Sequence, residues 1–132
     1  MNAEAFKSRK VKDVMEAPVS TDGSDSLAEV NARLLSSPSE MVGVVSGQKL
    51  QGVVTGSTLK DGLLANKTDA ASVMRQNPVT IDMDGTVNDA VELMHSRGFD
   101  KLPVVDNSGN FVGVVSKKGL LRKMSSEISI TY

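Results

Sequence analysis

The sequence contains no cysteine and no tryptophan, and it has only one tyrosine and three phenylalanines. The absence of cysteine excludes disulfide bonds, thiolate catalysis and cysteine-ligated zinc, and it agrees with a reducing compartment, so we expect a cytoplasmic protein. An excess of charge of one sign is also missing, because 15 basic and 16 acidic side chains leave a formal net charge of −1. With no overall field to attract a polyanion, nucleic acid is not an expected partner.

Long apolar runs are absent as well. Residues 1–12 are polar and basic rather than a signal peptide, and no later segment approaches the roughly 18 apolar residues of a membrane span. We therefore expect a soluble protein that does not enter a membrane.

Signatures of catalysis and of metal binding are missing too. Neither a His-x-x-Glu-His nor a Gly-x-x-x-x-Gly-Lys-Ser/Thr pattern occurs, and His95, the only histidine, has no Ser or Cys to form a nucleophilic pair. The acidic residues Asp82, Asp84 and Asp89 are spaced like caps and turns rather than like a metal cage. We expect a protein that is not an enzyme and that requires no cofactor.

What the sequence does contain is an internal repeat. Pro-Val-Ser-Thr at 18–21 returns as Pro-Val-Thr-Ile at 78–81, and Gly-Val-Val-Thr at 52–55 returns as Gly-Val-Val-Ser at 113–116. Repeated units bury their apolar faces mainly against each other, and the cleft between them is the default binding site. In a chain of 132 residues this indicates one domain built from two copies, each too small to be stable alone.

An amphipathic helix is predicted in each copy. In the second copy, four apolar residues at helical spacing form one face: Val87, Ala90, Val91 and Met94. Thr86 can cap the start of this helix and Gly98 its end. A weaker stripe in the first copy follows candidate caps at 24–26 and is formed by Leu27, Val30, Leu34 and Leu35.

A β-hairpin is predicted after each of these helices. Residues 102–105 and 111–115 are rich in β-branched side chains and flank the turn-forming run Asp-Asn-Ser-Gly. Residues 41–45 and 50–54 match them, with a shorter turn. Val-rich strands without clean alternation predict sheets that helices cover. Each copy is thus an α/β (α+β) unit with the order β-α-β-β-α, and the two copies should pack with pseudo-twofold symmetry.

The boundaries follow from the polar run at 66–69, which stands where one copy gives way to the next and precedes a short helix at 70–74. We predict an N-terminal extension at 1–10, the first copy at 11–65, the second at 66–124 and a tail at 125–132. In the tail, Ile128, Ile130 and Tyr132 alternate with polar residues. This pattern is either a frayed end or the start of an element of a longer protein.

These residues resemble a tandem pair of CBS (cystathionine β-synthase type) domains, the Bateman module. The resemblance covers roughly residues 11–124. Its most specific part is Gly-Phe-Asp-Lys-Leu-Pro-Val-Val-Asp at 98–106, followed after a turn by Gly-Val-Val-Ser. Val-Met at 14–15 and again at 73–74, each shortly before a proline, is similar to the leading segment of the family.

The resemblance implies a regulatory module that binds AMP, ADP, ATP or another adenosyl compound such as S-adenosylmethionine between the copies. It also implies a homodimer and an attached or separate regulated protein. Positions that line the adenine pocket in the family correspond in the second copy to Thr80, Ile81, Lys101, Pro103 and Val104. In the first copy they correspond to Ser20, Thr21, Met41 and Val44, with Gly43 in the place of the proline. From sequence alone these are strand residues that pack a core, and the second copy offers the better site.

Thr55 and Ser116 stand where a strand ends and a helix begins, which places a hydroxyl and free backbone N–H groups at the positive end of a helix dipole. Each hydroxyl is either a phosphate ligand or simply the cap of its own helix. Beside Ser116, the lysines Lys117 and Lys118 either meet an anion or form a solvated face. Two lysines in a first helical turn oppose the helix dipole, which favours an anion there.

The sequence departs from the family where an Asp normally follows the Ser or Thr by three positions and binds the ribose hydroxyls. Thr58 and Gly119 occupy these positions, so neither copy has the carboxylate. A hydrogen bond to a charged group contributes about 1.5–3 kcal/mol, and its loss weakens a nucleotide about tenfold to a hundredfold. Two interpretations therefore stay open: a ligand sensor, or a dimerisation module with degenerate nucleotide sites.

Overall fold

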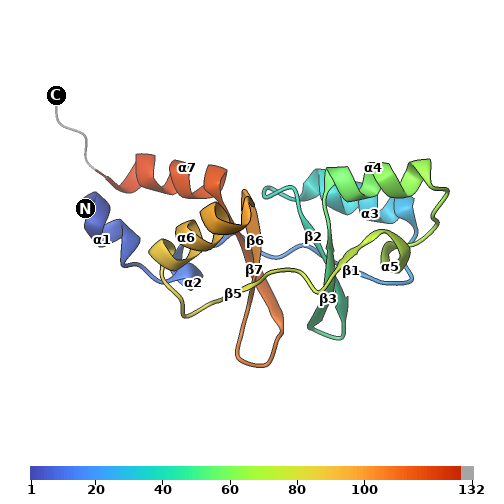
Figure 1. Cartoon of the computed structure of the whole chain (residues 1–132), viewed down its shortest axis with the longest axis horizontal. Coiled ribbons are helices and arrows are strands. Elements are labelled where there is room, and N and C mark those ends of the chain that lie inside the picture. Colours follow the sequence, from blue (N-terminus) through green and yellow to red (C-terminus); the bar gives the residue numbers. More distant parts are fainter. Residues whose placement is uncertain (129–132) are drawn as a thin grey trace.

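The computed structural model describes residues 1–128 and contains two similar halves that lie side by side (Figure 1). The first half runs through β1 (Ser20–Asp22), α3 (Leu27–Ser36), β2 (Val42–Ser46), β3 (Lys49–Val54) and α4 (Gly56–Leu64). The second half runs through β5 (Ile81–Asp82), α6 (Val87–Arg97), β6 (Lys101–Val105), β7 (Phe111–Ser116) and α7 (Lys117–Glu127). Both halves confirm the predicted order β-α-β-β-α.

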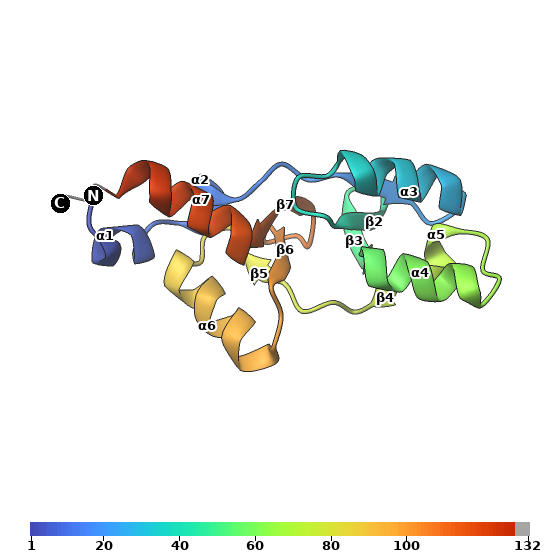
Figure 2. The same cartoon turned by 90° about the horizontal axis from the view of Figure 1, so that it is seen from above.

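The two sheets have the same topology, which is the structural counterpart of the sequence repeat. In each sheet the short first strand runs parallel to the second, and the second and third form an antiparallel hairpin. The register of both hairpins shifts at the same place, between Val44 and Val45 in the first copy and between Val104 and Val105 in the second. Helices α3 and α4 lie over one half, and α6 and α7 over the other (Figure 2).

The segment that leads into each copy packs against the other copy. The N-terminal helices α1 (Ala3–Lys7) and α2 (Val11–Val14) bring Phe6 and Val11 into the core of the second half. The predicted N-terminal extension, residues 1–10, thus contributes a buried aromatic side chain, Phe6, which is 2% exposed. Conversely, α5 (Ala70–Val73) contacts α4, and β4 (Arg75–Gln76) adds a strand to the first sheet beside β3. This exchange ties the two copies together.

A small apolar cluster also joins the two sheets directly. Met41 and Val53 of the first copy pack there with Phe111 and Val114 of the second. Gly43 makes this contact possible, because a Cβ at that position would lie 2.4 Å from the Phe111 ring. The position matching Pro103 is therefore a glycine for a packing reason.

The helix stripes are only partly buried as predicted. Val87, Ala90 and Met94 are buried, but Val91 is 44% exposed, and in the first copy Leu35 is 80% exposed. These two residues lie at the margin of their stripes, beyond the part of the helix that the sheet covers. The predictions that Thr86 caps α6 and that Gly98 ends it are confirmed.

The tail predicted at 125–132 begins inside α7, which continues to Glu127. The predicted pattern at Ile130 and Tyr132 lies outside the described residues. Within residues 1–128, no helix combines the length and the apolar character that crossing a membrane requires.

Candidate functional site

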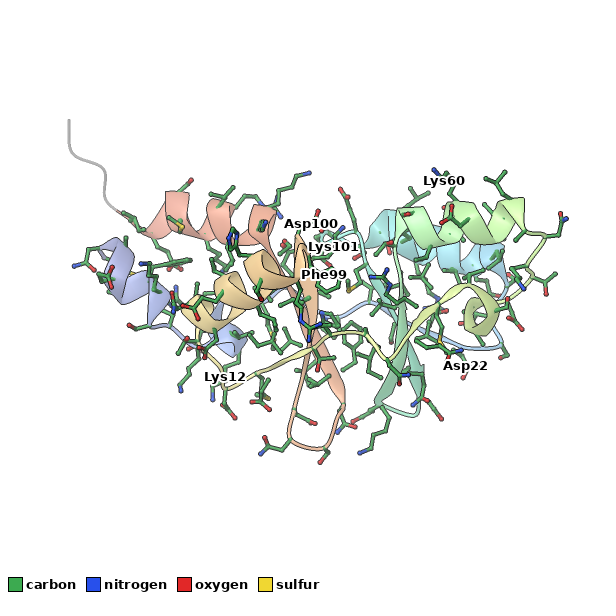
Figure 3. The ribbon with its side chains drawn as sticks, in the orientation of Figure 1. Lys12, Asp22, Lys60, Phe99, Asp100 and Lys101 are labelled. Atoms are coloured by element: carbon green, nitrogen blue, oxygen red, sulfur yellow. The ribbon has the colours of Figure 1, made fainter. Side chains whose placement is uncertain are left out.

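A cleft of about 460 Å³ opens where the two copies meet, and we call it the first cleft. Its lining combines the start of α4 in the first copy with the loop between α6 and β6 in the second. Phe99 and Asp100 of that loop and Lys101 at the start of β6 lie near the middle of the molecule in Figure 3. A volume of this size suits one small ligand such as a mononucleotide. The lining residues are Glu40, Met41, Val53, Thr55, Gly56, Ser57, Thr58, Arg75, Pro78, Val79, Phe99, Asp100, Lys101, Leu102 and Pro103.

The start of α4 presents polar groups to this cleft. Thr55 and Thr58 form a capping box at the start of α4, in which each side chain faces the backbone N–H of the other residue. The Thr58 hydroxyl accepts a hydrogen bond from the Thr55 N–H at 2.9 Å and donates to the Thr55 carbonyl at 3.1 Å. A Cβ added at Gly56 would meet no atom within 4 Å, so the first turn is open. Unpaired N–H groups of a first turn, with a hydroxyl beside them, suit an anion.

Cationic and aromatic groups face the helix start from the other copy. The Arg75 guanidinium lies over the Phe99 ring, 5.8 Å from its centroid. The Lys101 ammonium group donates to the Glu40 carbonyl at 3.4 Å, which joins the two sides of the cleft. A planar ring held under a guanidinium offers a stacking surface, and the lysine offers a positive charge.

A second cleft, of about 540 Å³, also lies between residues of the two copies. It is lined by α7 from Gly119 to Ser126 and by the leading segment of the first copy, with Glu16, Arg122 and Lys123 among its residues. The Ser116 hydroxyl beside it is buried and accepts from the Gly119 N–H at 2.9 Å, so it caps α7 as one of the two interpretations predicted. Lys117 and Lys118 follow in the first turn, both exposed.

The structure divides the predicted site residues into four groups. The first cleft brings together Met41, Thr55, Thr58, Lys101 and Pro103. The second cleft holds Gly119, next to the buried Ser116. The core takes Thr21, Val44, Ile81 and Val104, each at most 7% exposed. Ser20, Thr80, Lys117 and Lys118 line neither cleft.

Several residues of the clefts were not predicted from the sequence, among them Arg75, Phe99 and Glu16. Arg75 and Glu16 each follow the repeated Val-Met pair of a leading segment, so the repeat marks their positions. Their roles depend on which copy the leading segment packs against, and a linear sequence does not show that.

The perturbed carboxylates lie in turns or ion pairs, away from both clefts. Hydrogen bonds from Ser24 lower the pKa of Asp22, and the Thr21 hydroxyl, at 2.6 Å, lowers the pKa of Asp25. The Asn110 backbone N–H does the same for the pKa of Asp106. Across the described part of the chain, no cluster of three or more His, Cys, Asp or Glu residues has the geometry to hold a metal ion.

Comparison with protein families and curated sequences places these features among known proteins. Residues 70–126 match the family model of the CBS domain. An inosine-5′-monophosphate dehydrogenase of Thermoplasma acidophilum is 30% identical over 80 residues, 61% of this chain and 16% of that protein. A homoserine O-acetyltransferase of Methanocorpusculum labreanum is 28% identical over 112 residues, 83% of this chain and 23% of that protein. The chain spans less than half the length of the curated relatives that it matches.

Solved structures share the whole fold. The CBS domain pair of protein MJ0100, in complex with 5′-methylthioadenosine and S-adenosyl-L-methionine, has a TM-score of 0.80 at 24% identity and covers 90% of this chain and 98% of its own. CBSX2 in complex with AMP has a TM-score of 0.75 at 21% identity, with coverages of 89% and 96%. The cytosolic domain of the Mg²⁺ channel MgtE in complex with ATP has a TM-score of 0.74 at 24% identity, with coverages of 90% and 50%.

Proposed function

Because the chain belongs to the CBS domain family and has the fold of a CBS domain pair, we propose that it is a regulatory module rather than an enzyme. In this proposal an adenine nucleotide or a related adenosyl compound binds in the first cleft and controls an attached or partner protein. The family assignment supports a regulatory role, and the residues that line the first cleft support the ligand class.

One observation carries the proposal: the first cleft joins the open start of α4 in one copy to Arg75 of β4 and to Phe99 and Lys101 of the other copy. The two sides complement the two ends of a nucleotide. A phosphate suits the helix start and the Lys101 ammonium group, and a purine ring suits the Phe99 face and the apolar wall formed by Val79 and Leu102.

A ligand in this position can regulate because it touches both copies. A ligand shifts an equilibrium between two conformations only when it binds them unequally. One that bridges Thr55 and Lys101 favours the arrangement of copies that brings both groups within reach. A partner whose affinity depends on the angle between the copies would then respond to the ligand.

The solved relatives support this ligand class. The MJ0100 pair is in complex with 5′-methylthioadenosine and S-adenosyl-L-methionine, CBSX2 with AMP and the MgtE domain with ATP. Adenosine is the group common to all of these ligands. We therefore place adenosyl compounds first among the candidates for this chain.

Isothermal titration and thermal unfolding test the proposal, with AMP, ADP, ATP, S-adenosylmethionine and 5′-methylthioadenosine each at about 1 mM. A ligand at a hundred times its dissociation constant adds about 2.7 kcal/mol, which raises the midpoint of a domain this size by about 10 °C. Thr55→Val should weaken binding of the responsive compound about tenfold and should cost about 1 kcal/mol of unfolding free energy, because the hydroxyl also belongs to the capping box of α4.

The matched control is Thr68→Val, an exposed threonine in the linker between the copies. It should leave both binding and the unfolding midpoint unchanged. If none of the five compounds binds, or if Thr55→Val leaves the affinity of a bound compound unchanged, the proposal for this cleft is wrong.

A dimerisation module without ligand is the second candidate, and one specific observation favours it. Large apolar side chains are exposed on the helices: Leu35, Leu63, Leu64, Val91 and Leu121. In this alternative the helix faces form a homodimer and Thr58 and Gly119 mark degenerate sites. Sedimentation velocity separates the two, since a monomer at micromolar concentration excludes the alternative.

A further inference from the structure

The start of α7 corresponds under the repeat to the start of α4, but its surroundings are closed. Arg75 pairs with Val53 of β3, and Glu16 pairs in the same way with Val114 of β7. Four residues around the start of α7 thus match residues of the first cleft, and we call them the matching site: Glu16 for Arg75, Ser39 for Phe99, Ser116 for Thr55 and Gly119 for Thr58. Each is more buried than its counterpart, and Ser39 and Ser116 are only 5% and 6% exposed.

The Glu16 carboxylate fills the space at this helix start. A Cβ built at Gly119 would lie 2.4 Å from Glu16 Oε1, so a side chain at position 119 would collide with the carboxylate. The Glu16 N–H donates to the Val114 carbonyl at 2.8 Å and the Val114 N–H donates back at 3.0 Å, which fixes the residue in place. The second carboxylate oxygen, Oε2, is buried. The glycine at position 119 therefore makes room for Glu16.

An ion pair with α7 holds the carboxylate in this position. Oε1 accepts from the Arg122 guanidinium at 3.1 Å. Arg122 stands in α7 where Asp61 stands in α4, so the first copy has the opposite charges at the two matching positions. Within residues 1–128, Arg75 and Asp61 form no ion pair, and Arg75 lies over the Phe99 ring instead. The pair is made beside α7 and not beside α4.

Negative charge is favoured where the Glu16 carboxylate lies. The first turn of a helix carries the positive end of the helix dipole, so an anion beside it is stabilised. Lys117 and Lys118 add positive charge to the same turn of α7, which increases the demand for an anion there. The chain meets this demand with its own carboxylate.

We propose that Glu16, held by Arg122, closes the matching site by taking the place of an anionic ligand, and that it thereby limits the chain to one ligand site, the first cleft. Glu16 thus determines which of the two helix starts can accept a ligand. This inference rests on the proposed function of the first cleft, whereas the closure itself can be measured without a ligand.

Single cysteines measure whether each helix start is open, because the chain contains no other thiol. Thr55→Cys and Ser116→Cys both place a thiol at a helix N-cap, so the two thiols differ mainly in access. The reagent is the anionic disulfide 5,5′-dithiobis(2-nitrobenzoate). The Thr55→Cys thiol should react about tenfold faster than the Ser116→Cys thiol, because a buried thiol reacts only when its surroundings open.

Substitutions of Glu16 then separate closure from charge. Glu16→Ala should accelerate the reaction of the Ser116→Cys thiol about tenfold and leave that of the Thr55→Cys thiol unchanged. Glu16→Gln removes the same charge but keeps the shape and can still accept from Arg122, so it should change the rate at position 116 by less than about threefold. Glu29→Ala, at an exposed acidic position on α3, is the matched control and should change neither rate.

Three results would overturn the closure by Glu16. Equal acceleration by Glu16→Ala and Glu16→Gln would mean that the lost charge alone alters the acidity of the thiol. A Val44→Cys thiol in the core of the first half reports global unfolding, and equal acceleration there and at position 116 would mean that Glu16 only stabilises the fold. Rapid reaction of the Ser116→Cys thiol in the presence of Glu16 would mean that the site is open.

Isothermal titration of the full chain with AMP, ATP and S-adenosylmethionine tests the number of sites. We expect one molecule of a responsive compound per wild-type chain, with its affinity weakened by Thr55→Val. Two molecules per wild-type chain would contradict the limit to one site while supporting the proposed function. If no compound binds, the proposed function is wrong, and the thiol rates alone then confirm or contradict the closure by Glu16.

Discussion

Glu127, near the end of α7, gives a pH-dependent test of how the N-terminal segment is held. Its carboxylate pairs with Arg9, which lies between α1 and α2, and this hydrogen bond lowers the pKa of Glu127 below its ordinary value of 4.5. A pKa lowered by folding means that the charged form stabilises the fold above the unfolded pKa and that this stability is lost as the pH falls through the folded pKa.

We therefore expect Glu127→Gln to be less stable than the wild type at pH 7 and the difference to shrink below about pH 4.5. Urea denaturation at pH 7, 5, 4 and 3 measures it. Glu4→Gln is the control, because Glu4 forms an exposed pair with Lys7 on the surface. An equal difference between wild type and Glu127→Gln at pH 7 and pH 3 would show that the ion pair does not stabilise the fold.

At the same scale, the sequence revealed the missing carboxylates at positions 58 and 119 but not how the molecule accommodates them. Thr58 turns inward and bonds its own helix start, and the space beside Gly119 is filled by Glu16 from a distant part of the chain. A motif shows the absence of a side chain from its expected position. Glu16 reaches the space beside Gly119 because each leading segment packs against the other copy, and a linear sequence does not show that packing.

At the scale of elements, Gly98 is the clearest single determinant of where a helix ends. Its φ of 70° lies in the left-handed region, and a Cβ there would meet nothing within 4 Å. Gly98→Ala should therefore cost about 1 kcal/mol of unfolding free energy from the backbone alone, and Gly98→Asn less, because Asn tolerates this conformation. Urea denaturation measures both variants, and equal stability of all three proteins would contradict the argument.

Periodicity predicted the helices and hairpins because short-range patterns determine them. The predicted hairpin at 102–105 and 111–115 corresponds to β6 and β7, and the capped helix from Val87 corresponds to α6. Burial of individual stripe residues was less predictable, as Val91 and Leu35 show. How far round a helix the core extends depends on the sheet beside it, and a sequence window does not contain that information.

At the scale of the whole molecule, the sequence predicted two copies but not that each copy is completed by the other. The resulting core of the second half contains Phe6, Val11 and Val14 from the start of the chain together with Leu102 and Val115. Val73 and Ala70, from the leading segment of the second copy, pack in the core of the first. The boundary predicted between residues 65 and 66 divides the sequence into two copies, whereas each packed half contains residues from both sides of that boundary.

This interlocking predicts that the two copies unfold as one unit. Phe6→Ala removes a fully buried aromatic side chain at one end of the molecule and should cost about 3–5 kcal/mol. Amide hydrogen exchange can follow Val44 and Val104, the matching buried residues of the two central strands. If both copies open together, exchange at the two positions accelerates by the same factor, because it reports the shared free energy of global unfolding. Leu35→Ala, at an exposed position, should leave both rates nearly unchanged. Acceleration at Val104 with none at Val44 would mean that the copies unfold independently and that the exchanged segments do not couple them.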